Sequence, residues 1–505
     1  MPITVLTDRQ VKFLLNNLTT DEVLNLQNSM RCALYDYATG ASSSQVSTDD
    51  QPHKTKVSAR NGTTTLFMPS VISGSMAVKV ATFTTPSAYT GSSAINKSNS
   101  KHEVSPQGAL TLMTAEGIPF AFINSREIIA FRTALTSSLL ISRRSKVKVL
   151  TCFGCGRQAY WHVRLTLLLR GSSIKKVNFI NRTLSDRAAA LLKEFIGFDP
   201  EIKKAEGWSD TSFNLTSLNL GDVERALKTQ VRSADVIFCT TPSTVPLFDP
   251  TILTSNEGRK RARLIVAVGS YSSDMIELPP EIIDQAIRPQ TTNHFFQRRA
   301  EEGGAIVVDS LTCLRDAGEL VEANVRADRT VELGELVMLE YIENEQAMVD
   351  DYDDGAPQSQ ISQDNLLVNN SNFNRGVFRS DSIDSCSSGT PLSKITSRKS
   401  STNLSKPPSS KRSGNRSRRS SDSSNAWKRR SSVTESINVR LRKPSLLSLR
   451  SRKTQTELEN KLSRWLSIGN VIYKSVGIGL MDLVSGIDIV KLAKEKGIGT
   501  TISDF

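Results

Sequence analysis

The middle of the chain alternates between short apolar runs and segments with helical periodicity. The predicted strands lie at 147–153, 177–180, 235–239, 264–268 and 305–308. Helical patterns occupy the intervals between them, as at 185–195 and 280–287. Strands that alternate with helices over a long stretch are typical of βαβ units. We therefore predict an α/β fold with a Rossmann-type, doubly wound parallel sheet.

The first third of the chain and its end predict a second, α+β region. The expected helices cover 7–15, 20–37, 128–142 and, near the C-terminus, 478–496, which is amphipathic. The expected strands cover 63–67 and 77–83 with a break at Met68-Pro69, a hairpin at 108–114 and 118–124, and a strand with a glycine turn at 467–477. Polar segments at 41–55 and 87–105 are expected to be loops.

Residues 348–458 differ in kind from the rest. The segment opens with Asp350-Asp351-Tyr352-Asp353-Asp354 and becomes rich in serine and arginine. Such a composition offers too little apolar surface to offset the chain entropy, so we predict disorder. Because ordered patterns return after it, we interpret it as an insertion within a domain.

The insertion also carries most of the net charge of +13. Residues 351–450 hold 18 Lys/Arg against 8 Asp/Glu, a local excess of +10 that leaves +3 for the remainder. The charge therefore predicts no nucleic-acid partner for the rest of the chain. Arg418-Arg419-Ser420-Ser421 and Arg429-Arg430-Ser431-Ser432 fit basophilic kinases, and phosphate there would reverse the local charge. The alternative to regulation by phosphorylation is an unregulated solvated loop. Nuclear import and nonspecific binding to acidic surfaces are minor alternatives for the function of the basic segment.

The six cysteines are scattered, which predicts reduced thiols in a reducing compartment. Cys152 and Cys155 form a C-x-x-C, but no second pair completes a metal site, and no metal is expected. The N-terminus lacks the basic and apolar regions of a secretory signal, and no stretch is long enough for a membrane helix. We expect a cytoplasmic protein without a membrane partner.

A glycine-rich turn, Gly154-Cys155-Gly156-Arg157-Gln158-Ala159, follows the first central strand. Gly154 permits a tight turn, and Gly156 lets backbone N–H groups approach a pyrophosphate at a helix N-terminus. Ala159 lets the helix pack closely on the strand. The order strand, turn, helix, strand predicts a dinucleotide site; an ordinary tight turn is the alternative.

The strand after this helix ends in Asn181-Arg182-Thr183. NAD-specific sites usually place Asp or Glu here, to accept hydrogen bonds from the ribose hydroxyls. A guanidinium flanked by small polar groups suits a 2′-phosphate instead. We expect NADP(H) in preference to NAD(H); a surface arginine at a strand end is the neutral interpretation.

Together these motifs resemble those of the ornithine cyclodeaminase/mu-crystallin family, over residues 5–346 and 466–503. The segments that carry the resemblance are the glycine turn with Gln158, Phe67-Met68-Pro69, Val78-Lys79-Val80, Arg132-Thr133-Ala134, and Tyr473-Lys474-Ser475-Val476-Gly477 followed by Asp482. The resemblance implies a nicotinamide-dependent homodimer that acts on small amino acids, imino acids or ketimines.

The resemblance also implies a discontinuous α+β substrate and dimerisation domain beside the Rossmann domain. We assign the NAD(P)-binding Rossmann domain to 128–315 and the insertion to 348–460. The substrate and dimerisation domain then comprises 1–127, 316–347 and 461–505.

Individual roles follow from the same resemblance. Arg60 and Arg132 would hold a substrate carboxylate, Lys79 would bind it or donate a proton, and Val476 would line the substrate pocket. The implied cofactor contacts are Arg132, Thr133, Gly154, Gly156, Arg157, Gln158, Asn181, Arg182, Thr183, Thr240, Thr241, Val268, Gly269 and Ser475. Ordinary exposed charges are the alternative for Arg60 and Lys79, and a helix-surface role is the alternative for Arg132.

One departure from the family pattern bears on the reaction. Ornithine cyclodeaminases carry an aspartate after the glycine that ends the 264–268 strand, and Tyr271 occupies that position here. Asp274 lies three residues later and would need a rearranged loop to replace it. Cyclodeamination needs a carboxylate to manage protons on two amines, so the tyrosine favours the mu-crystallin-like branch.

The leading hypothesis is therefore an NADP(H)-dependent reductase of a carboxylate-bearing imine or ketimine. The enzymatic alternative is an ornithine cyclodeaminase that converts L-ornithine to L-proline and ammonia. A protein that binds NADPH without turnover, with the insertion as its regulated output, is the alternative from another class.

Overall fold

The computed structural model describes residues 2–39, 52, 54–59, 63–72, 74–84, 107–219, 223–287, 304–337 and 463–503. All of them belong to one compact unit, Met1–Asp351 with Leu449–Phe505, from which Tyr352–Ser448 are divided. Arg60, the loop expected at 87–105, most of the loop expected at 41–55 and the insertion with its candidate kinase sites lie outside the described residues.

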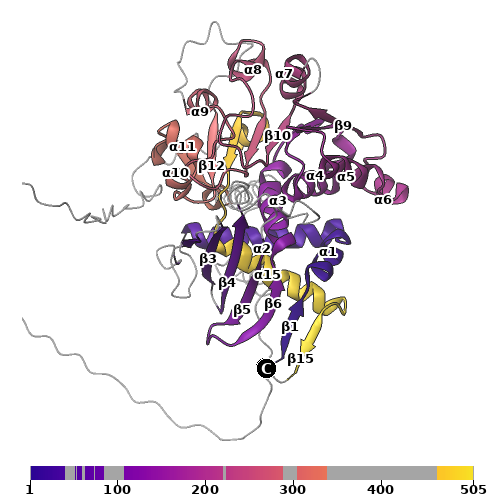
Figure 1. Cartoon of the computed structure of the whole chain (residues 1–505), viewed down its shortest axis with the longest axis vertical. Coiled ribbons are helices and arrows are strands. Elements are labelled where there is room, and N and C mark those ends of the chain that lie inside the picture. Colours follow the sequence, from indigo (N-terminus) through magenta and orange to yellow (C-terminus); the bar gives the residue numbers. More distant parts are fainter. Residues whose placement is uncertain are drawn as a thin grey trace, which may run out of the picture. The chain divides into compact units, whose positions relative to one another are not determined.

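An eight-stranded sheet forms one half of the compact unit (Figure 1). Its strands, in spatial order, are β13 (Thr330–Glu332), β12 (Ala305–Val308), β14 (Val471–Lys474), β11 (Leu264–Ala267), β10 (Val236–Cys239), β7 (Val149–Phe153), β8 (Lys176–Asn181) and β9 (Ser212–Ser217). Every pairing is parallel. The predicted doubly wound parallel sheet is thus confirmed.

Helices cover both faces of this sheet, as the crossovers of parallel strands require. They are α4 (Arg157–Arg170), α5 (Asp186–Ile196), α6 (Pro200–Ala205), α7 (Val223–Ser233), α8 (Thr251–Thr254), α9 (Pro280–Ile287), α10 (Cys313–Asp316) and α11 (Gly318–Glu322). Short 3₁₀ turns follow at Gly171–Ser173, Gly258–Lys260 and Ala327–Arg329.

A seven-stranded sheet forms the other half of the compact unit (Figure 1). Its spatial order is β15 (Thr500–Ile502), β1 (Ile3–Leu6), β6 (Pro119–Asn124), β5 (Gln107–Thr114), β4 (Ser75–Thr84), β3 (Thr63–Ile72) and β2 (Thr55–Ser58). The accompanying helices are α1 (Asp8–Asn16), α2 (Thr20–Thr39), α3 (Arg126–Ser142) and α15 (Gly479–Glu495). Thr7 caps α1 in a capping box with Gln10, which explains why the helix begins there.

One continuous core joins the two halves. It runs from α1, α2 and α15 through α3 to α4 and the inner face of the parallel sheet. Helix α3 is buried along almost its whole length, because it lies between the helices of the first half and α4 of the second. A separate cluster covers the opposite face of the parallel sheet.

Most predicted elements of the two halves are confirmed, and two details differ. Strand β3 continues through Met68-Pro69, where we predicted a break. The partner β2 pairs only with residues 64–67 of β3, so within the described sheet the proline occupies a stretch that pairs on one side. Proline is tolerated at such an edge because no ladder hydrogen bond is lost.

The C-terminal segment is divided between the halves, where we assigned all of 461–505 to the substrate domain. Strand β14 pairs between β11 and β12 in the parallel sheet, whereas α15 and β15 join the other half. Strand β13, which follows the predicted boundary at 315, also pairs in the parallel sheet. The described chain therefore passes from the parallel sheet to the other half between β14 and α15.

Candidate active site

The glycine turn lies where the order of the parallel strands reverses. Strand β7 has β8 on one side and β10 on the other, so the loops after β7 and β10 face each other. Ligands of open α/β sheets bind in this crevice. Gly154 has a φ of +98°, and a β-carbon there would lie 2.8 Å from Thr240 Oγ1 and 3.1 Å from Thr241 Cγ2. Only glycine fits between the two loops.

The N-terminus of α4 faces the same crevice, and no side chain of the described residues caps it. Gly156 is the N-cap, no side chain caps the first turn, and that turn contains no acidic residue. Free N–H groups and the positive end of the helix dipole make this terminus suitable for an anion.

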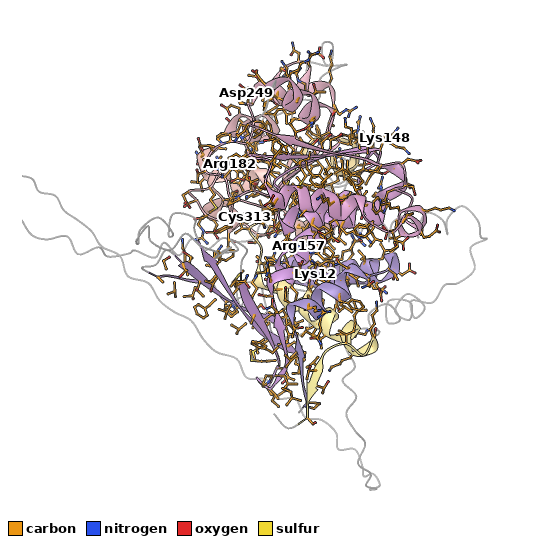
Figure 2. The ribbon with its side chains drawn as sticks, turned by 45° about the vertical axis from the view of Figure 1, so that its right-hand side comes forward. Lys12, Lys148, Arg157, Arg182, Asp249 and Cys313 are labelled. Atoms are coloured by element: carbon orange, nitrogen blue, oxygen red, sulfur yellow. The ribbon has the colours of Figure 1, made fainter. Side chains whose placement is uncertain are left out.

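The guanidinium of Arg157 is held by other residues. Its Nε lies 2.9 Å from Glu127 Oε1, its Nη1 lies 3.3 Å from Glu194 Oε2, and its Cζ lies 4.0 Å from the centre of the Tyr160 ring. Figure 2 labels Arg157 near Lys12 of α1 and apart from Arg182. The backbone of Arg157, rather than its side chain, therefore remains for a ligand at the turn.

A buried carboxylate ties together the loops that follow β10 and β11. Glu277 accepts hydrogen bonds from the backbone N–H groups of Thr241 and Gly269, each at 2.7 Å, and of Ser270 at 3.2 Å. Burial raises the pKa of the Glu277 carboxyl, and the Lys474 charge acts in the opposite direction. The two predicted cofactor loops are thus fixed to each other.

A second buried carboxylate orders the loop after β14. Asp309, directly after β12, accepts hydrogen bonds from Ser475 Oγ and Gly477 N, both at 2.7 Å, and from the Tyr473 hydroxyl. The Ser475 N–H donates to the carbonyl of Ala267 at the end of β11. The loop that contains the implied cofactor contact Ser475 is therefore anchored at the carboxyl ends of the central strands.

Lys79, Arg132 and Asp482 form a buried charged cluster. The Lys79 Nζ lies 2.5 Å from Asp482 Oδ2, and Arg132 Nε lies 3.1 Å from Oδ1 of the same carboxylate. None of the three side chains is more than 5% exposed. Gly477 packs on the guanidinium, since a β-carbon there would lie 2.4 Å from an Arg132 Nη atom. The cluster thus adjoins the Ser475–Gly477 loop.

The sequence around α15 explains how its aspartate reaches a strand residue. A β-carbon on Gly486 would lie 2.6 Å from the Leu110 side chain, and one on Gly479 would lie 2.9 Å from the Pro69 carbonyl. Gly479, Asp482 and Gly486 fall on one helical face, so the two glycines bring that face close to the sheet. Lys79 in turn stands between the small residues Ala77 and Ala81 on the buried face of β4.

Burial lowers the pKa of Lys79 to about 8. The Asp482 carboxylate opposes this change, and the Arg132 charge adds to it. A lysine with a pKa near 8 is well suited to donate a proton near neutral pH, because both protonation states are accessible.

A third buried ion pair lies at the end of β14. Lys474 Nζ is 2.9 Å from Glu319 Oε1 and donates to the Ser270 carbonyl at 2.7 Å, with both charged side chains 1% exposed. The Ser270 hydroxyl donates to the same carboxylate at 2.7 Å. This network fixes the start of the loop that contains Tyr271.

Tyr271 occupies the position of the family's aspartate, and its ring stacks on Phe83 with centroids 5.1 Å apart. Phe83 lies four residues after Lys79 on β4, and both therefore point to the same face of the sheet. Asp274 is exposed, and hydrogen bonding with Ser272 lowers the pKa of its carboxyl. The structure places an aromatic pair, Tyr271 with Phe83, on the Lys79 face, whereas Asp274 is exposed to solvent.

The end of β8 is open to solvent. Arg182 and Thr183 are exposed, and the Asn181 side-chain amide donates to the Thr183 carbonyl at 2.8 Å. The Thr133 hydroxyl donates to the Ile129 carbonyl within α3, and the Gln158 amide, at 3.4 Å, reaches the same carbonyl. The Gln158 contact ties α4 to α3.

The predicted site residues that the structure describes thus fall into four groups. Lys79 and Arg132 meet in the buried cluster, and Gly154, Gly156, Thr240, Thr241, Val268, Gly269, Ser475 and Val476 lie at the carboxyl ends of the parallel strands. Asn181, Arg182 and Thr183 lie at the end of β8. The side chains of Thr133, Arg157 and Gln158 serve helix contacts, and Arg60 lies outside the described residues.

The sequence interpretation gave no role to the buried carboxylates Glu277, Asp309, Glu319 and Asp482. The available signal was position, because Asp309 directly follows an apolar strand and Asp482 stands one helical turn after a glycine loop. Buried carboxylates are rare unless they are paired, so acidic residues in otherwise apolar segments indicate such networks.

The described residues contain no cluster of three or more His, Cys, Asp or Glu side chains that could hold a metal ion. The cysteines among them form no disulfide. Within the same residues, no helix has the length and apolar character needed to span a membrane.

No protein-family model matches the chain. An uncharacterised protein of Saccharomyces cerevisiae is 26% identical over 255 residues, which are 46% of this chain and 63% of that protein. The match thus spans less than two thirds of that relative's length.

Solved structures give a broader match. An archaeal alanine dehydrogenase dimer with bound NAD aligns with a TM-score of 0.53 at 15% identity, over 100% of both chains. The Δ1-pyrroline-2-carboxylate reductase of Thermococcus litoralis, in complex with NADH and L-proline, gives 0.54 at 14% identity over 99% of this chain and 100% of its own. A probable ornithine cyclodeaminase of Bordetella pertussis gives 0.51 at 15% identity over 99% of both. The chain therefore has the fold of these proteins, which is the fold that its resemblance to the ornithine cyclodeaminase/mu-crystallin family implied.

Proposed function

We propose that the chain catalyses the NADP(H)-dependent reduction of a C=N bond in a small substrate that carries a carboxylate. The observation that carries this proposal is the buried cluster of Lys79, Arg132 and Asp482 beside the Ser475–Gly477 loop. Burying two cations costs free energy unless they are paired, and this cluster pairs them with one carboxylate only. A substrate carboxylate would supply the second negative charge.

The glycine turn fits a dinucleotide. Gly154 leaves no room for a side chain between the loops, and the first turn of α4 lacks both a cap and an acidic residue. The backbone N–H groups of that turn would hold the pyrophosphate. When bound, a reduced nicotinamide supplies hydride to the carbon of the C=N bond.

Arg132 is the side chain best arranged to bind the carboxylate. Its Nε donates to Asp482, whereas its Nη1 has only the Met481 sulfur at 3.5 Å, a weak acceptor. Within the described residues, no other acidic group pairs with this guanidinium. Arg132 can therefore offer a carboxylate its Nη atoms while Asp482 fixes its orientation.

Lys79 would supply the proton that reduction of the C=N bond requires on nitrogen. Its pKa of about 8 leaves most of the side chain protonated at neutral pH. The short contact with Asp482 keeps the ammonium in place and favours its charged form. The lysine is thus both positioned and able to donate.

The loop after β11 supports reduction rather than cyclodeamination. The position of the family's aspartate holds Tyr271, whose ring stacks on Phe83, and Asp274 is exposed. Removing an amine as ammonia needs a base near that amine, and the exposed Asp274 is less suited to this role than a buried carboxylate at the position of Tyr271. Reduction of a preformed imine needs only hydride and one proton.

The preference for NADP(H) rests on Arg182 at the exposed end of β8. No acidic residue occupies the three positions that end this strand, so a ribose 2′-phosphate would meet no repulsion there. A guanidinium binds such a phosphate through several donors at once.

We propose a homodimer that forms through the outer face of the seven-stranded sheet. Val57, Phe67 and Phe122 lie on that face and are 51%, 40% and 45% exposed. An apolar sheet face of this kind favours burial against a partner. Light scattering of the wild type and of Phe122→Lys tests this: the dimer mass should appear only in the wild type, and a monomeric wild type would contradict it.

A direct assay tests the proposed reaction. NADPH consumption is followed with Δ1-pyrroline-2-carboxylate and related cyclic ketimines, using the wild type, Lys79→Met and Lys148→Met. Lys148 is exposed and serves as the matched control. We expect turnover in the wild type and in Lys148→Met, and none in Lys79→Met. Ammonia release from L-ornithine without net NADPH consumption would instead support the cyclodeaminase, and NADPH binding without any turnover would support the non-catalytic alternative.

A further inference from the structure

The guanidinium of Arg187 lies over the glycine turn. Arg187 belongs to the first turn of α5, and a β-carbon placed on Gly156 would lie 3.3 Å from its Nη2 and 3.9 Å from its Cζ. The same charge acts on the neighbouring thiol, where it opposes the rise in the pKa of Cys155 caused by burial. Arg187 therefore reaches from the helix after β8 to the N-cap of α4.

Among the described residues, the charge of Arg187 has no ion-pair partner, although Asp186 precedes it in the same helical turn. The Arg187 side chain is exposed. A cation in the first turn of a helix is also opposed by the helix dipole. Next to it, α4 presents a second positive helix end without a cap or an acidic residue. Positive charge from both sources thus converges on Gly156.

Comparison with Arg157 strengthens the point. Arg157 is the arginine that the turn motif itself supplies, yet Glu127 and Glu194 hold its guanidinium, and it stacks on Tyr160. The motif arginine is engaged in the helix contacts, whereas Arg187, beside the turn, forms no ion pair with any residue that the structure describes. Positive charge without a protein partner is unfavourable in the free protein. It is expected where a bound anion supplies the missing negative charge.

We propose that Arg187 binds the pyrophosphate of the dinucleotide, whereas Arg182 binds the 2′-phosphate. The assignment follows from position, because Arg187 lies at the helix N-terminus that receives a pyrophosphate and Arg182 lies at the strand end that receives the ribose. This inference rests on the proposed cofactor function. It predicts that the two arginines affect NADH and NADPH differently.

The test is a fluorescence titration of the full chain with NADPH and with NADH. Wild type is compared with Arg187→Gln, Arg182→Gln and Lys193→Gln, the last removing an exposed charge from the final turn of the same helix. Arg187→Gln should weaken both dinucleotides by the same factor, about tenfold, as expected for loss of a charge-assisted hydrogen bond. Arg182→Gln should weaken NADPH alone, and Lys193→Gln neither.

Three results would overturn the proposal. If Arg187→Gln binds both dinucleotides as Lys193→Gln does, the side chain does not contact the cofactor. If it weakens NADPH alone, Arg187 serves the 2′-phosphate instead. If the wild type binds neither dinucleotide, the proposed function itself fails. In the first two results the wild type still binds, so they contradict only the role proposed for Arg187. Arg187→Lys, which keeps the charge but not the fork, should bind both cofactors with intermediate affinity.

Discussion

The chemistry proposed for this chain depends on how single residues fit against the Arg132 guanidinium. Gly477 contacts this guanidinium directly and adopts a φ of +82°, which few other residues adopt. Asp482 holds Arg132 from the opposite side through Nε. The guanidinium therefore has little freedom to shift, and small changes around it should affect the reaction more than the fold.

We predict that Gly477→Ala lowers kcat/KM for an imine substrate by about two orders of magnitude. The new methyl group would displace the guanidinium that binds the carboxylate, since it would lie 2.4 Å from an Nη atom. Steady-state kinetics measure the effect, and NADPH titration should give nearly the wild-type Kd. The control is Gly497→Ala, where φ is +65° and no atom lies within 4 Å. Gly497→Ala introduces the same kind of backbone strain and should keep the wild-type kcat/KM. Equal losses of kcat/KM in the two variants would contradict the role proposed for Arg132.

The pH dependence of the reaction should follow Lys79. Because the protonated form donates, kcat/KM should fall as the pH rises through about 8. The Asp482 carboxylate raises the pKa of Lys79, so Asp482→Asn should shift this decline to lower pH. A pH–rate profile of both proteins measures the shift. An unchanged profile in Asp482→Asn would show that another group limits the rate.

At the scale of elements, helix α15 supplies Asp482, which contacts both Lys79 of β4 and Arg132 of α3. The same helix carries a second buried carboxylate, Asp488. Asp488 has an oxygen without a hydrogen-bond partner, and burial raises the pKa of its carboxyl to about 6. The folded state therefore binds an extra proton between the unfolded value near 3.8 and about 6, and its free energy of unfolding falls across this window as the pH rises.

Asp488→Asn should remove this loss. We predict that it raises the free energy of unfolding at pH 7 by about 3 kcal/mol and that most of this gain disappears near pH 4. Urea unfolding at the two pH values measures the difference. A gain of the same size at both values would contradict the assignment, because it would then not depend on ionisation.

Local pattern predicted much of the fold and part of the site. The parallel strands and the glycine turn were readable because buried strands are continuous apolar runs and because the turn needs glycine at fixed positions. The entry of β14 between β11 and β12 was not readable, since register between distant segments depends on tertiary packing. The same holds for Asp482, whose role appears only when α15 lies on β4.

Arg157 illustrates the limit of a motif. The sequence places it in the glycine turn, but its environment depends on α3 and α5, which supply Glu127 and Glu194. Arg187 shows the converse, because nothing in its local sequence marks it as a neighbour of Gly156.

At the scale of the whole molecule, the site depends on both halves and on a C-terminal segment that returns after the long insertion. Residues of the first unit alone supply every contact described for the site. Replacing Tyr352–Ser448 with a short Gly-Ser linker should therefore leave the thermal midpoint and the Kd for NADPH unchanged. Calorimetry and titration of the two proteins measure this. A lower midpoint or weaker binding would show that the insertion contributes to the catalytic unit.

The central claim is that hydride passes to the carbon of a C=N bond next to a carboxylate. The most direct measurement uses NADPH deuterated at C4 of the nicotinamide, with Δ1-pyrroline-2-carboxylate as acceptor, and locates the label by mass spectrometry and NMR. The account predicts deuterium on the carbon that bears the carboxylate, with no transfer in Lys79→Met although it still binds NADPH. Recovery of all deuterium in the cofactor, together with proline formation from ornithine, would contradict it.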